Sequence, residues 1–350
     1  MINGHGNNIY QYKKGKIKID FSSNIAFNNH SDTVLGYISN FMSVLKNYPD
    51  PNTVKLCGKI GRHHNVKSDN ILVVNGSAEG FYLVAHYIAR SVNKMAKSLI
   101  FIPSFAEYED SCLLFEHNIA FKNIAEFEDA DFSQFDSCWL GLPNNPDGYR
   151  VESDKIIENC INYPNCIFVV DMAYNDLCED ARYNAALTAG EIKNLIILSS
   201  LTKSFGIPGL RLGYIIGENS IIEKLSNMRP PWSVNALSIV AGEFIMDNYI
   251  ELELDKNELL GESRFLQCEI SKIDGFRVKK SPSNFFLCEI LGKSDVKELK
   301  NYLIEEHGIL VRDCSNFRSL SSKYFRIAAQ NHTSNRQLIE ALKMFSNRLQ

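Results

Sequence analysis

The stretch ILSSLTKSFGIPGLRLGYIIG, from Ile197 to Gly217, contains the features that decide the fold. An apolar run ends at Ser200, a lysine follows at position 203, a glycine-proline-glycine turn comes next, and Arg211 opens a second apolar run. Short apolar runs bounded by turn residues are typical of buried strands. Lys203 is therefore predicted at the carboxyl end of a strand, the edge at which open α/β sheets bind ligands. Taken alone, a lysine there is more often a solvated surface residue.

Similar apolar runs recur along the chain, with helical patterns between them. They are NILVV (70–74), SLIFI (98–102), SCWLGL (137–142), CIFVV (166–170), NLIILSS (194–200) and LGYIIG (212–217). Strands that alternate with helices predict a mostly parallel sheet, covered on both faces by the crossover helices. The sequence therefore predicts an α/β protein.

The pattern changes after a segment, 230–272, that is predicted to be helical and long. Beyond it we expect strands at FFLCEIL, ILVRD and YFRIAA, and helices near 296–306 and 335–348. We interpret residues 46–255 as a large domain and residues 256–350 as a smaller α/β domain. Residues 1–45 are polar and are expected to pack over the site and the small domain, without building the core.

Composition and charge narrow the classes of function. The 350 residues are 45% hydrophobic and 22% charged, with a formal net charge of -4. This balance is ordinary for a soluble globular protein and gives no global basic field, so neither nucleic acid nor a membrane is expected as a partner. Without a signal peptide or an apolar run of bilayer length, a cytoplasmic location is expected. Nine scattered cysteines predict reduced thiols, and no motif supports a metal site.

Several groups near the predicted strand ends suit a phosphate. Ser200 lies three residues before Lys203 and Arg211 eight residues after it, so a hydroxyl, an amine and a guanidinium lie near one turn. In VVNGSAEG, residues 76–78 open a predicted helix whose first N–H groups point outward. Such a glycine turn is common and weak by itself. Together the two stretches predict a phosphate held from two sides.

Two further stretches point to one cofactor. Asp171 ends the run VVD and could be only a helix cap, but a pyridine nitrogen needs such a carboxylate to stay protonated. Tyr174, and Asn145 in the turn LPNNPDG, could both bond a phenolic oxygen. A Schiff-base lysine at position 203, a phosphate site, a partner for a pyridinium and donors to a phenolate are the requirements of pyridoxal 5′-phosphate.

Six motifs follow one another in the order found in fold-type I pyridoxal-phosphate enzymes: NGSAEG, PSFAEYE, LPNNPDG, DMAY, SLTKSFGIPGLRLGY and YFRIAA. Over nearly its whole length the chain resembles the aminotransferase class I/II group. The resemblance implies a seven-stranded sheet sandwiched by helices, a homodimer with a shared active site, and Lys203, Asp171 and Tyr174 as catalytic residues. The implied cofactor-binding residues are Gly76, Ser77, Ala78, Phe105, Asn145, Asp171, Tyr174, Ser200, Lys203, Arg211 and, from the neighbouring subunit, Tyr48.

Within the group, the chain is most similar to the L-threonine-O-3-phosphate decarboxylases of cobalamin biosynthesis, through GHGNN, PPWSVNALS and ILVRDCSNFRSLSSKYFRIA. This resemblance implies a lyase that converts L-threonine O-3-phosphate to (R)-1-aminopropan-2-yl phosphate. We expect Arg326 to bind the substrate carboxylate and Arg312 its phosphate. The implied substrate-binding residues are His5, Gly6, Asn24, Asn145, Arg312 and Arg326.

Three departures and two alternatives accompany this interpretation. The family's HGGN reads HGNN, its NPTG reads NPDG, and its proline-glycine segment is replaced by AFNN after Asn24. An aminotransferase acting on histidinol phosphate or a related amino acid is the main alternative, because the sequence supplies anchors but not the angles that choose which bond at Cα breaks. A non-catalytic cofactor-binding protein is disfavoured by the intact Lys203 and Asp171.

Overall fold

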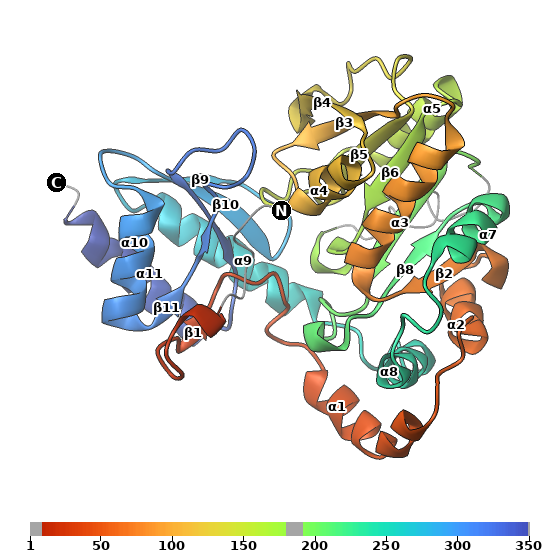
Figure 1. Cartoon of the computed structure of the whole chain (residues 1–350). Coiled ribbons are helices and arrows are strands. Elements are labelled where there is room, and N and C mark those ends of the chain that lie inside the picture. The colour runs from red at the N-terminus through yellow and green to blue at the C-terminus, as the bar shows by residue number, and fades with distance from the viewer. Residues whose placement is uncertain (1–8, 180–191, 349–350) are drawn as a thin grey trace.

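A computed structural model describes residues 9–179 and 192–348, which form two sheets with their own helices (Figure 1). The strand order of the larger sheet is β2-β8-β7-β6-β5-β3-β4. Only β8 runs antiparallel to its neighbours, which confirms the predicted seven-stranded, mostly parallel sheet. The strands are β2 (Ile71–Val74), β3 (Lys97–Ile102), β4 (Asn118–Asn123), β5 (Ser137–Gly141), β6 (Ile167–Asp171), β7 (Leu195–Ser200) and β8 (Gly213–Ile216).

The burial of these strands explains which of them the sequence revealed. Every residue of β2, β5 and β8 is buried, so these strands read as continuous apolar runs. Strand β4 lies at the edge of the sheet, and none of its residues is fully buried. An edge strand of this kind carries no apolar run, which is why the sequence analysis did not identify it.

Helices cover both faces of the large sheet and close two apolar cores. Alternate strand residues enter different cores: Val73 packs in one, and Leu72 and Val74 in the other. The first core is closed by α1 (Ser31–Ser39), α2 (Val54–His64), α5 (Ser153–Asn162) and α8 (Ala236–Asp247), and the second by α3 (Gly76–Ser91), α4 (Ala106–Leu114) and α7 (Asn219–Met228). No helix of the described ranges is long and apolar enough to cross a membrane.

The single long helix predicted over 230–272 is wrong. Helix α8 ends at Asp247, and a separate helix, α9 (Lys256–Ser271), begins after Asp255. The Asp255 side chain accepts a hydrogen bond from the backbone N–H of Glu258, which caps the new helix. A helix start inside the predicted segment thus separates the elements that pack on the two sheets.

The smaller sheet is antiparallel, in the order β12-β13-β10-β9. Its core also contains residues of α9, α10 and α11. The predicted strand ILVRD is divided in two, because β11 leaves this sheet to pair with β1 near the N-terminus. Strand β9 was not predicted. The elements are β1 (Ile19–Asp20), β9 (Phe276–Lys279), β10 (Phe285–Ile290), α10 (Val296–Tyr302), β11 (Ile309–Leu310), β12 (Arg312–Asp313), β13 (Tyr324–Ala328) and α11 (His332–Ser346).

The N-terminal segment does more than pack over the site. Phe21 is fully buried in the core of the small sheet, and Val34 is fully buried in one core of the large sheet. The expectation that this segment builds no core is therefore wrong, because single apolar side chains spaced among polar residues leave no periodic signal. The domain limits at residues 45 and 255 stay a prediction.

Candidate active site

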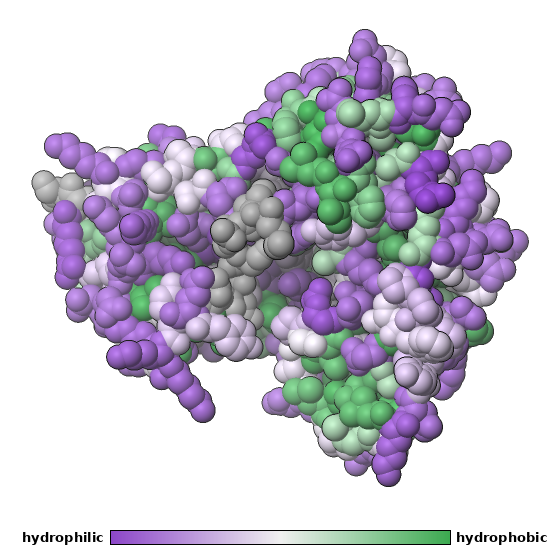
Figure 2. Space-filling view, viewed as in Figure 1, coloured by the Kyte–Doolittle hydropathy of each residue, from purple (hydrophilic) through white to green (hydrophobic). Residues whose placement is uncertain are grey.

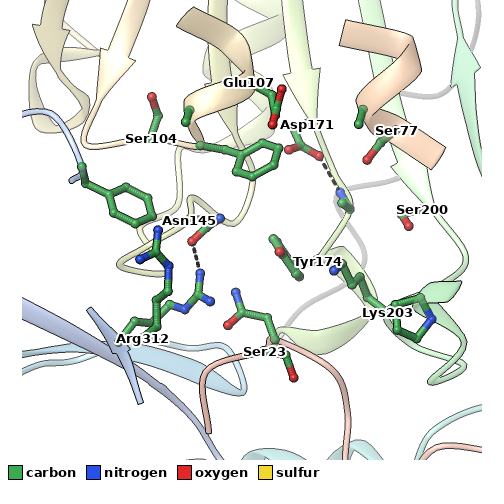
Figure 3. A pocket seen from close by; sticks show the side chains of 18 of the residues that line it. Ser23, Ser77, Ser104, Glu107, Asn145, Asp171, Tyr174, Ser200, Lys203 and Arg312 are labelled. Carbon is green, nitrogen blue, oxygen red and sulfur yellow. Dashed lines mark hydrogen bonds between the residues drawn. The ribbon is translucent and has the colours of Figure 1, made fainter. Parts of the chain in front are cut away.

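A cavity of about 390 Å³ opens between the two sheets, where Figure 2 shows a hollow. It lies beyond the carboxyl ends of β6 and β7, with the small sheet as its opposite wall (Figure 3). Loops after parallel strands form such sites because all the strands end at one edge of the sheet. The structure places most of the predicted site residues along this cavity: Asn24, Ser77, Ala78, Phe105, Asn145, Asp171, Tyr174, Ser200, Lys203, Arg211, Arg312 and Arg326.

The other predicted positions lie elsewhere. Tyr48 is 82% exposed, and its ring packs against Trp232 with the centroids 4.9 Å apart. It does not line the cavity of its own chain, and its role toward a neighbouring subunit stays a prediction. Gly76 is not among the residues that line the cavity, but it opens α3 beside Arg211, which does line it. His5 and Gly6 fall outside the described residues.

Two glycines allow three elements to meet at the predicted phosphate site. A Cβ at Gly76, where φ is +76°, would lie 2.3 Å from an Nη atom of Arg211. A Cβ at Gly213 would lie 2.5 Å from the backbone nitrogen of Ser77. The contact at Gly213 is with backbone, which cannot give way, and the positive φ of Gly76 favours glycine. Glycine at these positions therefore lets Arg211 and β8 lie against the first turn of α3. That turn receives no side-chain cap from Asn75, and its N–H groups with the guanidinium suit a phosphate.

Asp171 ends β6 with its carboxylate in the cavity. It accepts hydrogen bonds from the Tyr108 hydroxyl at 2.7 Å and from the Ala173 N–H at 3.0 Å. Burial raises the pKa of Asp171, while these two hydrogen bonds and the charge of Lys203 oppose the rise. A cationic group placed beside this buried carboxylate would stabilise its charged form.

Tyr108 is one residue of the site that the sequence analysis missed. Its ring is almost fully buried, and burial, followed by the charge of Asp171, raises the pKa of its hydroxyl well above the ordinary value. The residue belongs to PSFAEYE, three positions after Phe105, which precedes α4. That spacing puts both rings at the start of one helix, and this was the available signal.

The cofactor-free Asp171→Asn variant is expected to unfold at a higher temperature than the cofactor-free parent near neutral pH. Because burial raises the pKa of Asp171 above its ordinary 3.8, the stability due to its neutral form is present at low pH. That stability is lost as the pH rises through the raised pKa, whereas the amide carries no charge at any pH. Thermal unfolding of both proteins from about pH 4 to pH 8 measures the difference. Equal stability over the whole range would contradict this reading.

The backbone that carries Lys203 is anchored on both sides. The Thr202 hydroxyl lies 2.9 Å from the Ser200 hydroxyl, and the Ser204 hydroxyl donates to a carboxylate oxygen of Asp176 at 3.0 Å. The Lys203 Nζ lies 5.9 Å from the centre of the Tyr174 ring, and Figure 3 shows both side chains at the cavity. The amine is thus held close to the hydroxyl-bearing ring and directed at the space between the sheets.

Arg312 and Arg326 lie side by side on β12 and β13, and each is more than nine-tenths buried. Arg326 donates from Nη1 to the Asn145 amide oxygen and from Nη2 to the backbone oxygen of Ser22, and its Nε has no acceptor in the described chain. Burial lowers the pKa of both guanidiniums, to about 10 for Arg312, where the charge of Arg326 contributes. Two adjacent buried cations make this wall of the cavity a site for anions.

The AFNN segment, which follows Asn24 in place of the family's proline-glycine segment, packs against the loop that carries Lys203. The Asn29 amide oxygen lies where a side chain at Gly206 would be, 2.1 Å from a Cβ built there. Ala26 is fully buried, and its N–H donates to the backbone oxygen of Lys203 at 3.4 Å. Both amide atoms of Asn24 are buried without a partner among the described residues, as expected for a group that meets a ligand.

The aspartate in NPDG also has a structural partner. The Asp147 carboxylate is fully buried and accepts from Asn144 Nδ2 at 2.8 Å and from Lys279 Nζ at 2.6 Å. The same Asn144 amide donates to the backbone oxygen of Pro103, next to the Ser104–Phe105 loop. Lys279 belongs to β9, so the ion pair ties the small sheet to the turn that carries Asn145.

We expect Lys279→Met to lower the free energy of unfolding by about 1 to 2 kcal/mol, because it leaves a buried carboxylate without its cation. This value lies in the lower part of the range usual for a buried charge that loses its partner, because Lys279 is half exposed and solvent screens the pair. Denaturant unfolding measures the loss. Arg277→Met on the same strand, which breaks a pair with a more exposed carboxylate on Glu289, is the matched control and should cost less. Adding Asp147→Thr to the Lys279 variant should restore stability, and failure to do so would refute the pair's role.

Comparison with known proteins assigns the family. A model described as aminotransferase class I and II matches residues 16–343. The crystal structure of L-threonine-O-3-phosphate decarboxylase from Porphyromonas gingivalis superposes with a TM-score of 0.89 at 33% identity, over 94% of this chain and 99% of that one. A histidinol-phosphate aminotransferase from Caldanaerobacter subterraneus is 32% identical over 308 residues, 85% of this chain and 83% of that protein.

Threonine-phosphate decarboxylase from Salmonella typhimurium is 28% identical over 342 residues, 93% of this chain and 90% of that protein. The similarity thus extends to two activities, decarboxylation and amino transfer, at nearly equal identity. What all these relatives share with the chain is the fold and the family. The protein with Lys203 at the end of β7 therefore belongs to the aminotransferase class I and II family, whose enzymes depend on pyridoxal 5′-phosphate.

Proposed function

We propose that this enzyme decarboxylates L-threonine O-3-phosphate to (R)-1-aminopropan-2-yl phosphate, a step of cobalamin biosynthesis. The observation that carries the proposal is the pair of buried guanidiniums, Arg312 and Arg326, on one wall of the cavity. A substrate with both a carboxylate and a phosphate supplies an anion for each. Histidinol phosphate supplies only the phosphate.

The cavity fits pyridoxal phosphate by its donor set. The first turn of α3 and Arg211, brought together by Gly76, would hold the phosphate. Asp171 would hold the ring nitrogen in its protonated form, and Tyr174 and Asn145 would donate to the phenolic oxygen. Phe105 lines the same space and would pack on the ring. When bound, the cofactor supplies an electron sink for the pair released when a bond to the substrate Cα breaks.

The chain's own residues would bind and orient the substrate and move its protons. Arg326, fixed between Asn145 and Ser22, would hold the carboxylate in one direction, and Arg312 the phosphate. Asn24 brings two unpartnered amide atoms to the same space. The Lys203 amine would return a proton to Cα after carbon dioxide has left. His5 stays a predicted contact to the phosphate, and Gly6 a predicted contact to the substrate.

An aminotransferase is the second candidate, favoured by the 32% identity to a histidinol-phosphate aminotransferase. In that reaction Lys203 would remove the proton from Cα, and the carboxylate would not be lost. The two reactions need the same cofactor residues and differ in the bond that the substrate anchors orient. The proposal therefore depends on the two arginines and not on the cofactor site.

Product analysis separates the two candidates. Purified enzyme with added pyridoxal phosphate is incubated with L-threonine O-3-phosphate, and released carbon dioxide and the phosphorylated amine are quantified. A parallel reaction contains histidinol phosphate with 2-oxoglutarate, and glutamate is measured. Carbon dioxide release without glutamate formation supports the decarboxylase, whereas glutamate formation alone would overturn it.

We further propose a homodimer that shares its active sites and acts in the cytoplasm. Figure 2 shows a hydrophobic patch over α1 and η2 (Met42–Lys46), whose exposed large apolar side chains are Leu35, Met42 and Leu45. Tyr48, Val54 and Trp232 are exposed as well, and the Trp232 ring packs against Tyr48. All nine cysteines are unpaired, in keeping with a reducing compartment.

The dimer proposal predicts a molecular mass of twice that of the 39.7 kDa chain in sedimentation at micromolar concentration. Trp232→Asp is expected to weaken the association, because it places a charge in an apolar interface. Because each site would need Tyr48 of the other subunit, activity should fall with the dimer. A fully active monomer would rule out the shared site.

A further inference from the structure

We propose that Arg318 is a specificity-determining residue: its guanidinium binds the substrate phosphate together with Arg312 and is held ready at the cavity by Glu109. The inference rests on the proposed function in one respect, the phosphorylated substrate. Arg318 belongs to the loop between β12 and β13, and Glu109 to α4 on the large sheet. Both residues line the cavity, so their ion pair spans it from one wall to the other.

Arg318 and Glu109 form a bidentate contact. Arg318 Nε lies 3.0 Å from Glu109 Oε2, and one Nη lies 2.5 Å from the other carboxylate oxygen. The guanidinium also lies 4.1 Å from the centre of the Phe121 ring on β4. This fork geometry, which arginine offers to a carboxylate, is the same one that it offers to a phosphate.

The loop that carries Arg318 is built around Arg312. An Nη of Arg312 donates to the Asn316 amide oxygen at 3.0 Å, and the Arg312 guanidinium lies 5.2 Å from the centre of the Phe317 ring. Asn316 and Phe317 also line the cavity. A phosphate bound to Arg312 would therefore lie against the loop that also carries the guanidinium of Arg318.

The energetics allow a phosphate to replace Glu109. The Arg318 side chain is 47% exposed, and an ion pair with so exposed a member is weak because water competes for both charges. Glu109 carries one charge, whereas a phosphate monoester carries nearly two and three acceptor oxygens. Until the phosphate arrives, the pair neutralises an acid that would otherwise repel an anion entering the cavity. Arg318 thus favours phosphorylated over unphosphorylated substrates.

Steady-state kinetics with L-threonine O-3-phosphate and with L-threonine test this role. For Arg318→Gln in the enzyme with its cofactor, kcat/KM for L-threonine O-3-phosphate is expected to fall roughly tenfold, mainly through KM. The value for L-threonine should stay unchanged. Arg318→Lys, which keeps a charge but not the fork, should recover part of the loss. Arg277→Gln, which breaks an ion pair outside the cavity, is the matched control and should change neither value.

Glu109→Gln supplies the complementary measurement. Removing the competing carboxylate should leave KM for the phosphorylated substrate equal or lower, and it should not reproduce the loss seen for Arg318→Gln. Equal losses on both substrates for Arg318→Gln, or the same loss for Glu109→Gln, would overturn the inference in favour of a purely structural ion pair.

A binding measurement keeps this inference separate from the proposed reaction. Titration of inorganic phosphate into the cofactor-loaded protein is followed by calorimetry for the parent and for Arg318→Gln. Weaker phosphate binding by the variant supports the role of Arg318 even if no carbon dioxide is released, in which case only the proposed reaction fails. Carbon dioxide release together with unchanged phosphate binding and unchanged KM would overturn the inference alone.

Discussion

Lys203→Ala is expected to abolish both turnover and the covalent attachment of the cofactor. The Lys203 side chain is the amine at the end of β7, directed into the cavity that Asp171 and Arg211 also line. Loss of proton transfer alone typically lowers a rate roughly 10²- to 10⁴-fold, and loss of the covalent link adds to this. Reduction with borohydride followed by peptide mass spectrometry measures the attachment. In the parent protein the cofactor should remain on the peptide that contains Lys203.

The control for this change is Lys224→Ala, a lysine outside the cavity that lies 5.9 Å from the centre of the Tyr87 ring. It should keep both the reduced cofactor and the activity. The assignment of Lys203 fails if the cofactor is recovered on another peptide, or if the Lys203 variant still turns over at the rate of the parent.

Arg312→Ala should weaken the binding of L-threonine O-3-phosphate far more than that of L-threonine. Arg326→Ala should weaken the binding of both substrates to the same extent. The reason is that the two arginines are assigned different anions: Arg312 the phosphate and Arg326 the carboxylate, which both substrates carry. Loss of one charge-assisted partner costs about 1.5 to 3 kcal/mol, roughly ten- to a hundredfold in binding. The ratio of kcat/KM for the two substrates is the measurement, since any general damage to the fold cancels in it.

This second comparison distinguishes between substrate classes. If kcat/KM of the Arg312 variant fell by the same factor for both substrates, the phosphate assignment would be wrong. A transaminase acting on an unphosphorylated amino acid would then become the better reading. Arg312→Lys provides the conservative control, because it retains the charge next to Arg326 while it loses the fork that binds two oxygens.

The sequence predicted the elements whose residues form continuous apolar runs. The prediction failed where buried residues alternate irregularly with polar ones. Strands β2, β5 and β8 are buried along their whole length and were predicted. Edge strand β4 and the N-terminal contribution of Phe21 were not, since single buried residues among polar ones carry no period. The break between α8 and α9 was missed because the cap at Asp255 lies inside an otherwise helical pattern.

The sequence by itself determined the cofactor chemistry of this protein. Asp171 ends β6, and Lys203 and the turn before α3 come within three residues of the ends of β7 and β2. Strand ends of a parallel sheet meet at one edge by geometry alone. Local order along the chain was therefore enough to bring them together. Tyr108 was missed because its hydrogen bond to Asp171 depends on where α4 packs, whereas its spacing from Phe105 indicates only that both rings lie at the start of one helix.

Only the tertiary structure decided how the second wall of the cavity is built. The pairing of β12 with β13 sets Arg312 beside Arg326, and the loop between those strands carries Arg318 across to Glu109. The Asp147–Lys279 ion pair likewise joins residues of different sheets. Such contacts arise from packing between segments far apart in the chain, where the spacing of residues along the sequence conveys no distance. The sequence supplied Arg312 and Arg326 as candidate anchors, but their placement beside each other and near Arg318 became visible only in the folded molecule.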